Sequence, residues 1–403
     1  MTRDDEGVLP VDVTPSQRVR ILAAAATVIA LAAAVILVLS MSAAAGPGLL
    51  GDLEIYRGAI SYAVGGGDLY EWVYQHPTVH GLGFTYPPFA AVAMSWLVLV
   101  PMFTAKVIWT VLTFALAAAC CWLLASQASH LPGTRPAPTP ESRLLWTALA
   151  ALLFIFGYPF LHNLAVGQAS LFVIGLALFD HRLPRRWQGV LVGLAAAIKL
   201  TPLIFIPYYL ITRQWRQAAT SAGVFLAATG LTWVLFPAAS ASYWFDKLWQ
   251  TGRVGRTDST VNKSLLGFLS RLLPDGAATT IPWLVLAAAV ALFAYWRASK
   301  ALAAGDELGA VLLVGSLSVA VSPISWPHHE LWLALVACWW LMQRGWLPSL
   351  LTAVLAVILV GYPWYDDYVT MSPALAIGVE LPALAVLLVI GFGSRPRLAR
   401  VRR

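Results

Sequence analysis

Two carboxylates, Asp52 and Glu54, follow the first long apolar segment of the chain. A carboxylate so close to a membrane boundary is costly unless it is paired or has a task. One interpretation is structural, with Asp52 ending the apolar segment and pairing with Arg57. The other is chemical, because partial burial would raise the pKa of Asp52 and make it a general base. Since Mg²⁺ binds one or two carboxylates, a metal at this pair is also left open.

A basic group stands at a break between two short apolar pieces, at Lys199-Leu200-Thr201-Pro202. Each piece is too short to cross a membrane as a helix, and broken helices at that depth line a cavity in the protein. Lys199 either reaches past the lipid to water or lies beside a phosphate group at unwound backbone.

Two adjacent histidines, His328 and His329, follow a run with two prolines, Ser322-Pro323-Ile324-Ser325-Trp326-Pro327. Neighbouring residues on a helix point about 100° apart, so both imidazoles do not easily bind one metal. A histidine that donates to phosphate or orients a carboxylate fits this pattern better.

Further polar residues lie between other apolar segments. His162-Asn163 and Gly167-Gln168 are expected in a turn between two spans, where polar and flexible residues are needed in any case. Arg253, Arg256 and Lys263 form either a solvated charge run or an anion site. Asp258, Asn262 and Ser264 nearby suit a helix cap or contacts to sugar hydroxyls.

The composition places these residues in a membrane protein. Apolar residues make up 59% and charged residues 11% of the 403 residues, which excludes an ordinary soluble globule. The net charge of +7 is gathered in short loops between apolar segments, as the positive-inside rule predicts for a plasma-membrane protein, and this argues against a nucleic-acid partner. Cys120, Cys121 and Cys338 lie inside apolar segments and are expected to pack rather than to form disulfides.

The basic loops fix the expected topology: about twelve spans with both termini in the cytoplasm. The segment 87–101 is then a juxtamembrane helix, and outer loops run from about 46 to 102 and from 238 to 280. Residues 1–18 form a cytoplasmic tail, 19–394 the membrane domain and 395–403 a basic cytoplasmic tail. The basic residues left outside, which are candidates for an anionic ligand, are Arg57, Lys106, Lys199, Lys247, Arg253, Arg256, Lys263 and Arg271.

One carboxylate base, several cations and a cavity beside lipid suit the displacement of a lipid-phosphate leaving group. Such a group departs without a protein proton donor, so one base and electrostatic stabilisation of the phosphate suffice. A glycosidase would need two carboxyl groups flanking the bond.

Several short motifs share one order along the chain. They are Asp52-x-x-x-Tyr56, Gly67-Asp68-Leu69-Tyr70, Phe84-Thr85-Tyr86-Pro87-Pro88-Phe89, Gly167-Gln168, Lys199-Leu200-Thr201-Pro202 and Ser322-Pro323-Ile324-Ser325-Trp326-x-His328-His329. By these motifs the chain resembles the polyprenol-phosphate-mannose-dependent mannosyltransferases of glycosyltransferase family 87, in the GT-C membrane superfamily.

The resemblance implies an all-α, polytopic GT-C fold with juxtamembrane helices in the first outer loop. It also implies α-1,2-mannosyl transfer with inversion, without a metal or other cofactor, from polyprenyl-phosphate mannose to a mannosylated phosphatidylinositol on the outer face of the membrane. Asp52 would be the base. The candidates for the donor phosphate are Lys199, His328, His329 and Arg256, and those for the sugar and acceptor are Glu54, Tyr56, Tyr86, His162, Gln168, Asn262 and Lys263.

Two rival functions remain at this point. A flippase for lipid-linked sugars would also have broken helices and intramembrane cations, but it predicts polar residues through the full depth of the membrane. A related GT-C transferase that branches lipomannan or lipoarabinomannan, or adds arabinose, would use the same site chemistry.

Overall fold

The computed structural model describes residues 49–75, 81–128, 130, 139–360, 385, 387–389 and 391. Within these ranges the chain is helical, and its extended pairing is an isolated antiparallel bridge between Val73 and Gly83. The expected first span at 19–45, both tails, and nearly all of the expected last span at 373–393 lie outside the described residues.

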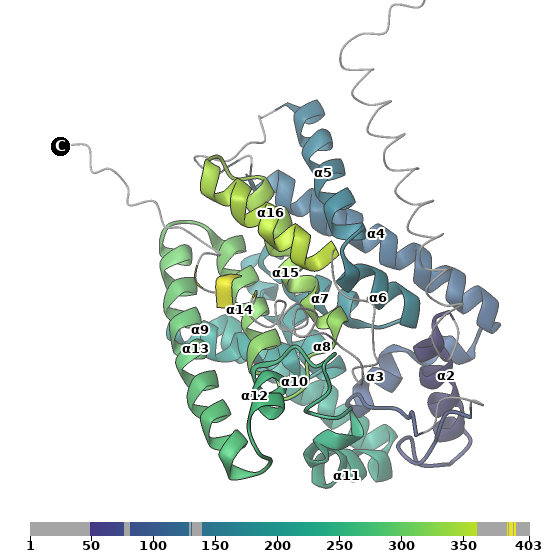
Figure 1. Cartoon of the computed structure of the whole chain (residues 1–403). Coiled ribbons are helices and arrows are strands. Elements are labelled where there is room, and N and C mark those ends of the chain that lie inside the picture. Colours follow the sequence, from purple (N-terminus) through teal and green to yellow (C-terminus); the bar gives the residue numbers. More distant parts are fainter. Residues whose placement is uncertain are drawn as a thin grey trace, which may run out of the picture.

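The described helices follow one another with short connections (Figure 1). The α-helices are α2 (Gly51–Val64), α3 (Pro88–Ala93), α4 (Met102–Ala128), α5 (Pro140–Ile155), α6 (Tyr158–Val166), α7 (Ser170–Phe179), α8 (Val190–Ile198), α9 (Phe205–Ile211), α10 (Trp215–Leu235), α11 (Pro237–Phe245), α12 (Leu265–Leu272), α13 (Ala277–Ala303), α14 (Glu307–Val321), α15 (Leu331–Leu341) and α16 (Trp346–Val360). The 3-10 helices are η1 (Ser95–Val98), η2 (Asp180–Arg182), η3 (Arg185–Trp187), η4 (Thr201–Ile204), η5 (Lys247–Trp249), η6 (Thr251–Arg253) and η7 (Pro327–Glu330).

Among the described residues, α4, α10 and α13 are long and apolar enough to cross a membrane. The 27 residues of α4 or of α13 give about 40 Å of helix, more than the roughly 30 Å of a hydrocarbon core. The pair α5 and α6, bent by 66° at its break, would be a fourth span if it crosses as one unit. The chain is therefore a largely helical, membrane-type protein, and the count of about twelve spans stays a prediction.

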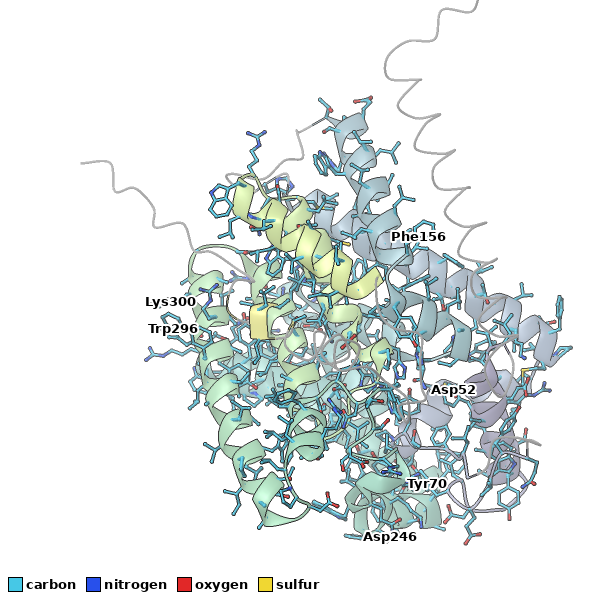
Figure 2. All side chains as sticks on the ribbon, viewed as in Figure 1. Asp52, Tyr70, Phe156, Asp246, Trp296 and Lys300 are labelled. Carbon is cyan, nitrogen blue, oxygen red and sulfur yellow. The ribbon has the colours of Figure 1, made fainter. Side chains whose placement is uncertain are left out.

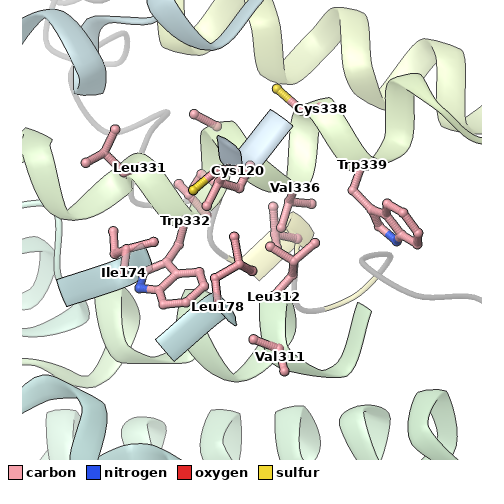
Figure 3. Close-up of a cluster of buried hydrophobic side chains, with 14 of the residues drawn as sticks. Cys120, Ile174, Leu178, Val311, Leu312, Leu331, Trp332, Val336, Cys338 and Trp339 are labelled. Atoms are coloured by element: carbon pink, nitrogen blue, oxygen red, sulfur yellow. The ribbon is translucent and has the colours of Figure 1, made fainter. Parts of the chain in front are cut away.

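The core lies around α14 and α15, which are apolar on every side and buried along nearly their whole length. α13 packs along α14, and α16 packs along α15. Figure 3 shows part of this cluster, with Trp332 and Val336 of α15 near Leu312 of α14. Cys120, Cys121 and Cys338 are buried and free, as the sequence predicts.

Three local predictions bear on the site. The break at Lys199 is confirmed, because α8 ends at Ile198 and η4 begins at Thr201. The segment 87–101 holds only α3 and η1, each too short to cross a membrane. The prediction that His162-Asn163 forms a turn is wrong, since both residues lie inside α6, which ends at Gly167.

Candidate active site

A cavity of about 440 Å³ opens where α2, the segment 82–87, the end of α6, the break at Lys199 and the segment 322–329 meet. Figure 2 labels Asp52 on the side of the molecule that carries α2, above Tyr70 and Asp246. The candidate residues from the sequence that line this cavity are Asp52, Tyr56, Tyr86, His162, Gln168, Lys199, His328 and His329. Residues that stand far apart in the chain thus share one space.

Asp52 is held by the side chain of Gln168, which follows the turn at the end of α6. The amide Nε2 of Gln168 donates a hydrogen bond to Asp52 Oδ2. Gln168 Oε1 accepts from the hydroxyl of Tyr86 at 2.5 Å, and Tyr56 Oη lies 3.4 Å from Tyr86 Oη. This chain of polar contacts fixes the plane of the Asp52 carboxylate and engages one of its two oxygens.

A glycine makes this contact possible. Gly167 ends α6 with a φ of +81°, in the left-handed region that glycine adopts most readily. A Cβ at position 167 would lie 2.6 Å from Leu53 Cδ1 and 3.1 Å from Leu50 Cα. The start of α2 therefore packs directly on the turn, and the backbone N–H of Leu50 donates to Ala165 O at 2.8 Å. This packing places Gln168 beside Asp52.

The basic end of the cavity centres on Lys199. Its Nζ lies 2.7 Å from His329 Nε2, donates to Ser170 Oγ at 3.0 Å and lies 5.3 Å from the centre of the Tyr86 ring. His329 Nδ1 accepts from the backbone N–H of Trp326 at 3.2 Å, so a neutral His329 carries its proton on Nε2. At 2.7 Å this Nε2–H donates to Lys199 Nζ, which accepts as a neutral amine in this arrangement.

His328 and His162 form the neighbouring part of the wall. Their rings stack with centres 5.3 Å apart, and their Nδ1 atoms are 3.3 Å apart. The rings of His328 and His329 stand at 90° to each other, so the two imidazoles do not converge on one ion. Only His329 contacts Lys199 directly.

Burial shifts the pKa values of the ionisable groups in the cavity. It raises the pKa of Asp52 to about 7, against the opposing effects of the hydrogen bond from Gln168 and the charge of Lys199. Burial likewise lowers the pKa of Lys199 to about 7, and burial together with Lys199 holds the pKa of His329 well below its usual value. Near neutral pH, Asp52 can accept a proton and Lys199 can carry one, while His329 is neutral.

The sequence of the chain matches one family of known proteins. Residues 84–323 match glycosyltransferase family 87. That match covers more than half of the chain and includes Tyr86, Gln168 and Lys199.

The chain belongs to glycosyltransferase family 87.

Two relatives from this family cover most of the chain. One is a polyprenol-phosphate-mannose-dependent alpha-(1-2)-phosphatidylinositol pentamannoside mannosyltransferase of Mycolicibacterium smegmatis, 34% identical over 324 residues, which are 78% of this chain and 75% of the relative. The other is a polyprenol-phosphate-mannose-dependent alpha-(1-2)-phosphatidylinositol mannoside mannosyltransferase of Mycobacterium tuberculosis, 33% identical over 290 residues, which are 70% of this chain and 68% of the relative. No solved structure matches the chain. The resemblance to family 87 predicted from the motifs is confirmed, and the protein is a glycosyltransferase.

Four candidate residues do not line the cavity of this family 87 protein. Glu54 binds Lys106 Nζ at 2.7 Å and the hydroxyl of Tyr74 at 2.7 Å. Arg256 is exposed and pairs with Asp258 at 2.7 Å. Glu54 and Arg256 therefore bind partners that lie outside the cavity.

Asn262 and Lys263, the other two, are buried beneath the histidine segment. Asn262 donates to Pro323 O at 3.0 Å and accepts from the backbone N–H of Ser325 at 2.9 Å. The backbone N–H of Lys263 donates to Ser325 O at 2.7 Å. These contacts hold the segment that carries His328 and His329, so Asn262 and Lys263 support the site from behind.

Four further residues line the cavity, of which the sequence indicated only the two cations, as candidates for an anionic ligand. The stretch from α11 to η6 lines the cavity with Tyr243, Lys247, Gln250 and Arg253. The only signal for them was the charge map, which placed Lys247 and Arg253 among the outer cations.

Within the described parts of the chain, no three histidine, cysteine, aspartate or glutamate side chains gather as a metal site would require. The expectation of a metal-free reaction stays a prediction.

Proposed function

We propose that this family 87 enzyme transfers mannose from polyprenyl-phosphate mannose to a mannosylated phosphatidylinositol, forming an α-1,2 linkage with inversion. The observation that carries the proposal is that Asp52 faces the same cavity as Lys199 and His329. The printed names of the relatives, which match this donor and acceptor, support it.

The chemistry is a single displacement at the anomeric carbon. The acceptor hydroxyl oxygen forms a bond to that carbon as the bond from the carbon to the phosphate oxygen breaks. The hydroxyl proton goes to Asp52, and the bonding electrons leave with the polyprenyl phosphate. Because one displacement inverts the anomeric centre, a β-linked donor gives an α-linked product.

Each side chain has a separate part in this step. Gln168 engages Asp52 Oδ2, which leaves Oδ1 as the oxygen for the acceptor hydroxyl. When the donor phosphate is bound, Lys199 carries a proton and the Nε2–H of His329 donates to a phosphate oxygen in place of Lys199, so both groups stabilise the charge that develops on the departing phosphate. Tyr86, between Gln168 and Lys199, contacts both groups and keeps the base and the phosphate site at a fixed separation.

The position of the reaction in the cell is part of the proposal. The basic loops of the sequence favour a plasma-membrane protein of about twelve spans with the cavity on the outer face. The donor and acceptor are lipids, so both would reach the cavity from the bilayer.

The test supplies purified protein in liposomes with radiolabelled polyprenyl-phosphate mannose and a panel of mannosylated phosphatidylinositols. We expect a product that gains one mannose, removable by an α-1,2-specific mannosidase. Transfer only to arabinan or to a branching position would reassign the acceptor to a related transferase. Movement of the labelled lipid between leaflets, without a mannosylated product, would establish a flippase instead.

A further inference from the structure

A second basic group lines the cavity and takes no part in the proposed displacement. Lys247 lies in η5 and Arg253 ends η6, and Gln250, between them in the sequence, also lines the cavity. The donor has one phosphate, for which Lys199 and His329 are already present. The cavity thus has cations for more than one anion.

Arg253 is held in a fixed orientation. Its Nη1 donates to Phe84 O at 2.6 Å, and its guanidinium carbon lies 5.4 Å from the centre of the Tyr70 ring. The Tyr70 ring in turn stacks on Tyr243 with centres 5.5 Å apart. An arginine fixed on a carbonyl and an aromatic face loses little freedom when its other N–H groups bind a ligand.

Lys247 adds a positive charge at the margin of the cavity. It pairs with Asp246 Oδ2 at 2.9 Å, and Gln250 Nε2 donates to Asp246 Oδ1 at 2.5 Å. Asp246 is half exposed, so this pair is screened by water and is weak. Asp246 is one carboxylate, whereas Lys247 and Arg253 are two cations, so this wall of the cavity keeps a net positive charge.

The two basic groups occupy different positions. Arg253 contacts the carbonyl of Phe84, whereas Lys199 faces the ring of Tyr86, two residues further along the chain. The partners described for Arg253 (Phe84 and Tyr70) and those described for Lys199 (Ser170, His329 and Tyr86) have no residue in common. Two phosphate groups held by these cations would therefore lie apart, and each would have its own countercharge.

We propose that Arg253 and Lys247, with Gln250, bind the phosphodiester of an anionic glycolipid acceptor, while Lys199 and His329 hold the phosphate of the donor. This inference rests on the proposed function and adds a binding site to it. Arginine suits the role because its planar guanidinium donates two parallel hydrogen bonds to phosphate oxygens. Specificity for an acceptor with a phosphodiester then comes from a site separate from the reacting hydroxyl.

The experiment compares Lys247→Gln and Arg253→Gln with the wild-type enzyme on two acceptors. One is a mannosylated phosphatidylinositol, and the other is an uncharged alkyl mannoside with the same terminal mannose. We expect the KM for the charged acceptor to rise about tenfold in each variant, since a charge-assisted hydrogen bond is lost. The KM for the uncharged acceptor and for the donor should change less than about twofold.

Arg256→Gln is the matched control, because Arg256 is an exposed arginine outside the cavity, three residues from Arg253. It should leave all three KM values unchanged. Arg253→Gln also removes the contact to Phe84, which the fold itself can require. Lys247 pairs only with the exposed Asp246 among the contacts described, so Lys247→Gln tests the site without that complication.

An equal rise in KM for both acceptors, or a rise for the donor alone, would overturn the inference. A second measurement distinguishes failure of this inference from failure of the proposed function. It is the binding of a short-chain phosphatidylinositol to the protein in the absence of donor. Weaker binding by Lys247→Gln and Arg253→Gln supports the site even if no mannose is transferred. Unchanged binding in both variants would overturn it even if transfer occurs.

Discussion

The side-chain amide of Gln168 donates a hydrogen bond to the carboxylate of Asp52, although 116 residues separate the two in the chain. The contact depends on Gly167, whose positive φ turns the chain at the end of α6 directly against the start of α2. It also opposes the effect of burial on Asp52, because it stabilises the ionised carboxylate. Gln168 therefore orients the proposed base and lowers its proton affinity, which burial, the larger effect, raises.

Gln168→Leu should shift the pH dependence of transfer. In the wild type, kcat/KM should fall as the pH drops through about 7, since Asp52 has a pKa of about 7 and must be ionised to accept a proton. Without the hydrogen bond from Gln168 this pKa rises, so the acid limb moves to higher pH. Initial rates between pH 5.5 and 8.5 measure the shift. Gln168→Glu is a second variant, which replaces the donating amide nitrogen by a carboxyl oxygen. An unshifted limb in Gln168→Leu would show that Gln168 does not act through Asp52.

Lys199→Gln should raise the KM for polyprenyl-phosphate mannose about tenfold or more and lower kcat as well. The reason is that Lys199 supplies the positive charge that faces the donor phosphate, which grows more negative as the bond breaks. Lys300→Gln is the control, since Lys300 is exposed on α13 and does not line the cavity. Donor kinetics at saturating acceptor measure the effect. Equal kinetics in the two variants would remove Lys199 from the phosphate site.

Some residues of the site could be predicted from their chemical type and their position in the sequence. Asp52, Lys199 and His329 each interrupt or border an apolar segment, where a polar group needs a partner or a task. That rule was enough to predict that they share a cavity. The broken helix at Lys199 was predictable for the same reason, because its two halves are too short to cross a membrane.

The sequence placed Glu54 and Asn262 among the candidates for the sugar and acceptor, and neither lines the cavity. Glu54 stands two positions after Asp52, and residues two apart on a helix point about 200° apart, so helix geometry alone turns it away from the cavity. The contacts of Asn262 to Pro323 and Ser325 cross about sixty residues, and no local periodicity reveals such a pairing. His162 was expected in a turn because the first of two spans was ended at residue 161, whereas α6 runs on to Val166.

Asn262→Ala should destabilise the protein by about 2–4 kcal/mol, because four hydrogen bonds of its buried amide are lost at roughly 1 kcal/mol or less each and their partners stay buried. These bonds reach Thr257, Ser264, Pro323 and Ser325. Thermal unfolding in detergent measures the loss. Asn262→Asp keeps the acceptor oxygen but turns a carboxylate oxygen toward the carbonyls of Thr257 and Pro323, so it should be destabilised at least as much at pH 7. Unchanged stability with a raised acceptor KM would instead place Asn262 at the sugar.

Glu54→Gln should keep turnover within about threefold of wild type. Glu54 binds Lys106 and Tyr74 and does not line the cavity, and a partly exposed ion pair contributes only about 0–1 kcal/mol to stability. Transfer rates at saturating substrates check this. A loss as large as that expected for Asp52 would mean that the second carboxylate takes part in the reaction.

Asp52→Asn tests the central claim most directly, with single-turnover transfer and donor binding measured on the same preparation. Because the pKa of Asp52 is raised in the folded state, the ionised carboxylate reduces stability as the pH rises from about 4 to about 7. The variant should therefore melt no lower than wild type at pH 8. We expect mannose transfer to fall at least about 100-fold, since a general base contributes that much or more, while donor affinity is retained. Transfer within a few fold of wild type, in a variant that still binds the donor, would contradict the assignment of Asp52 as the base.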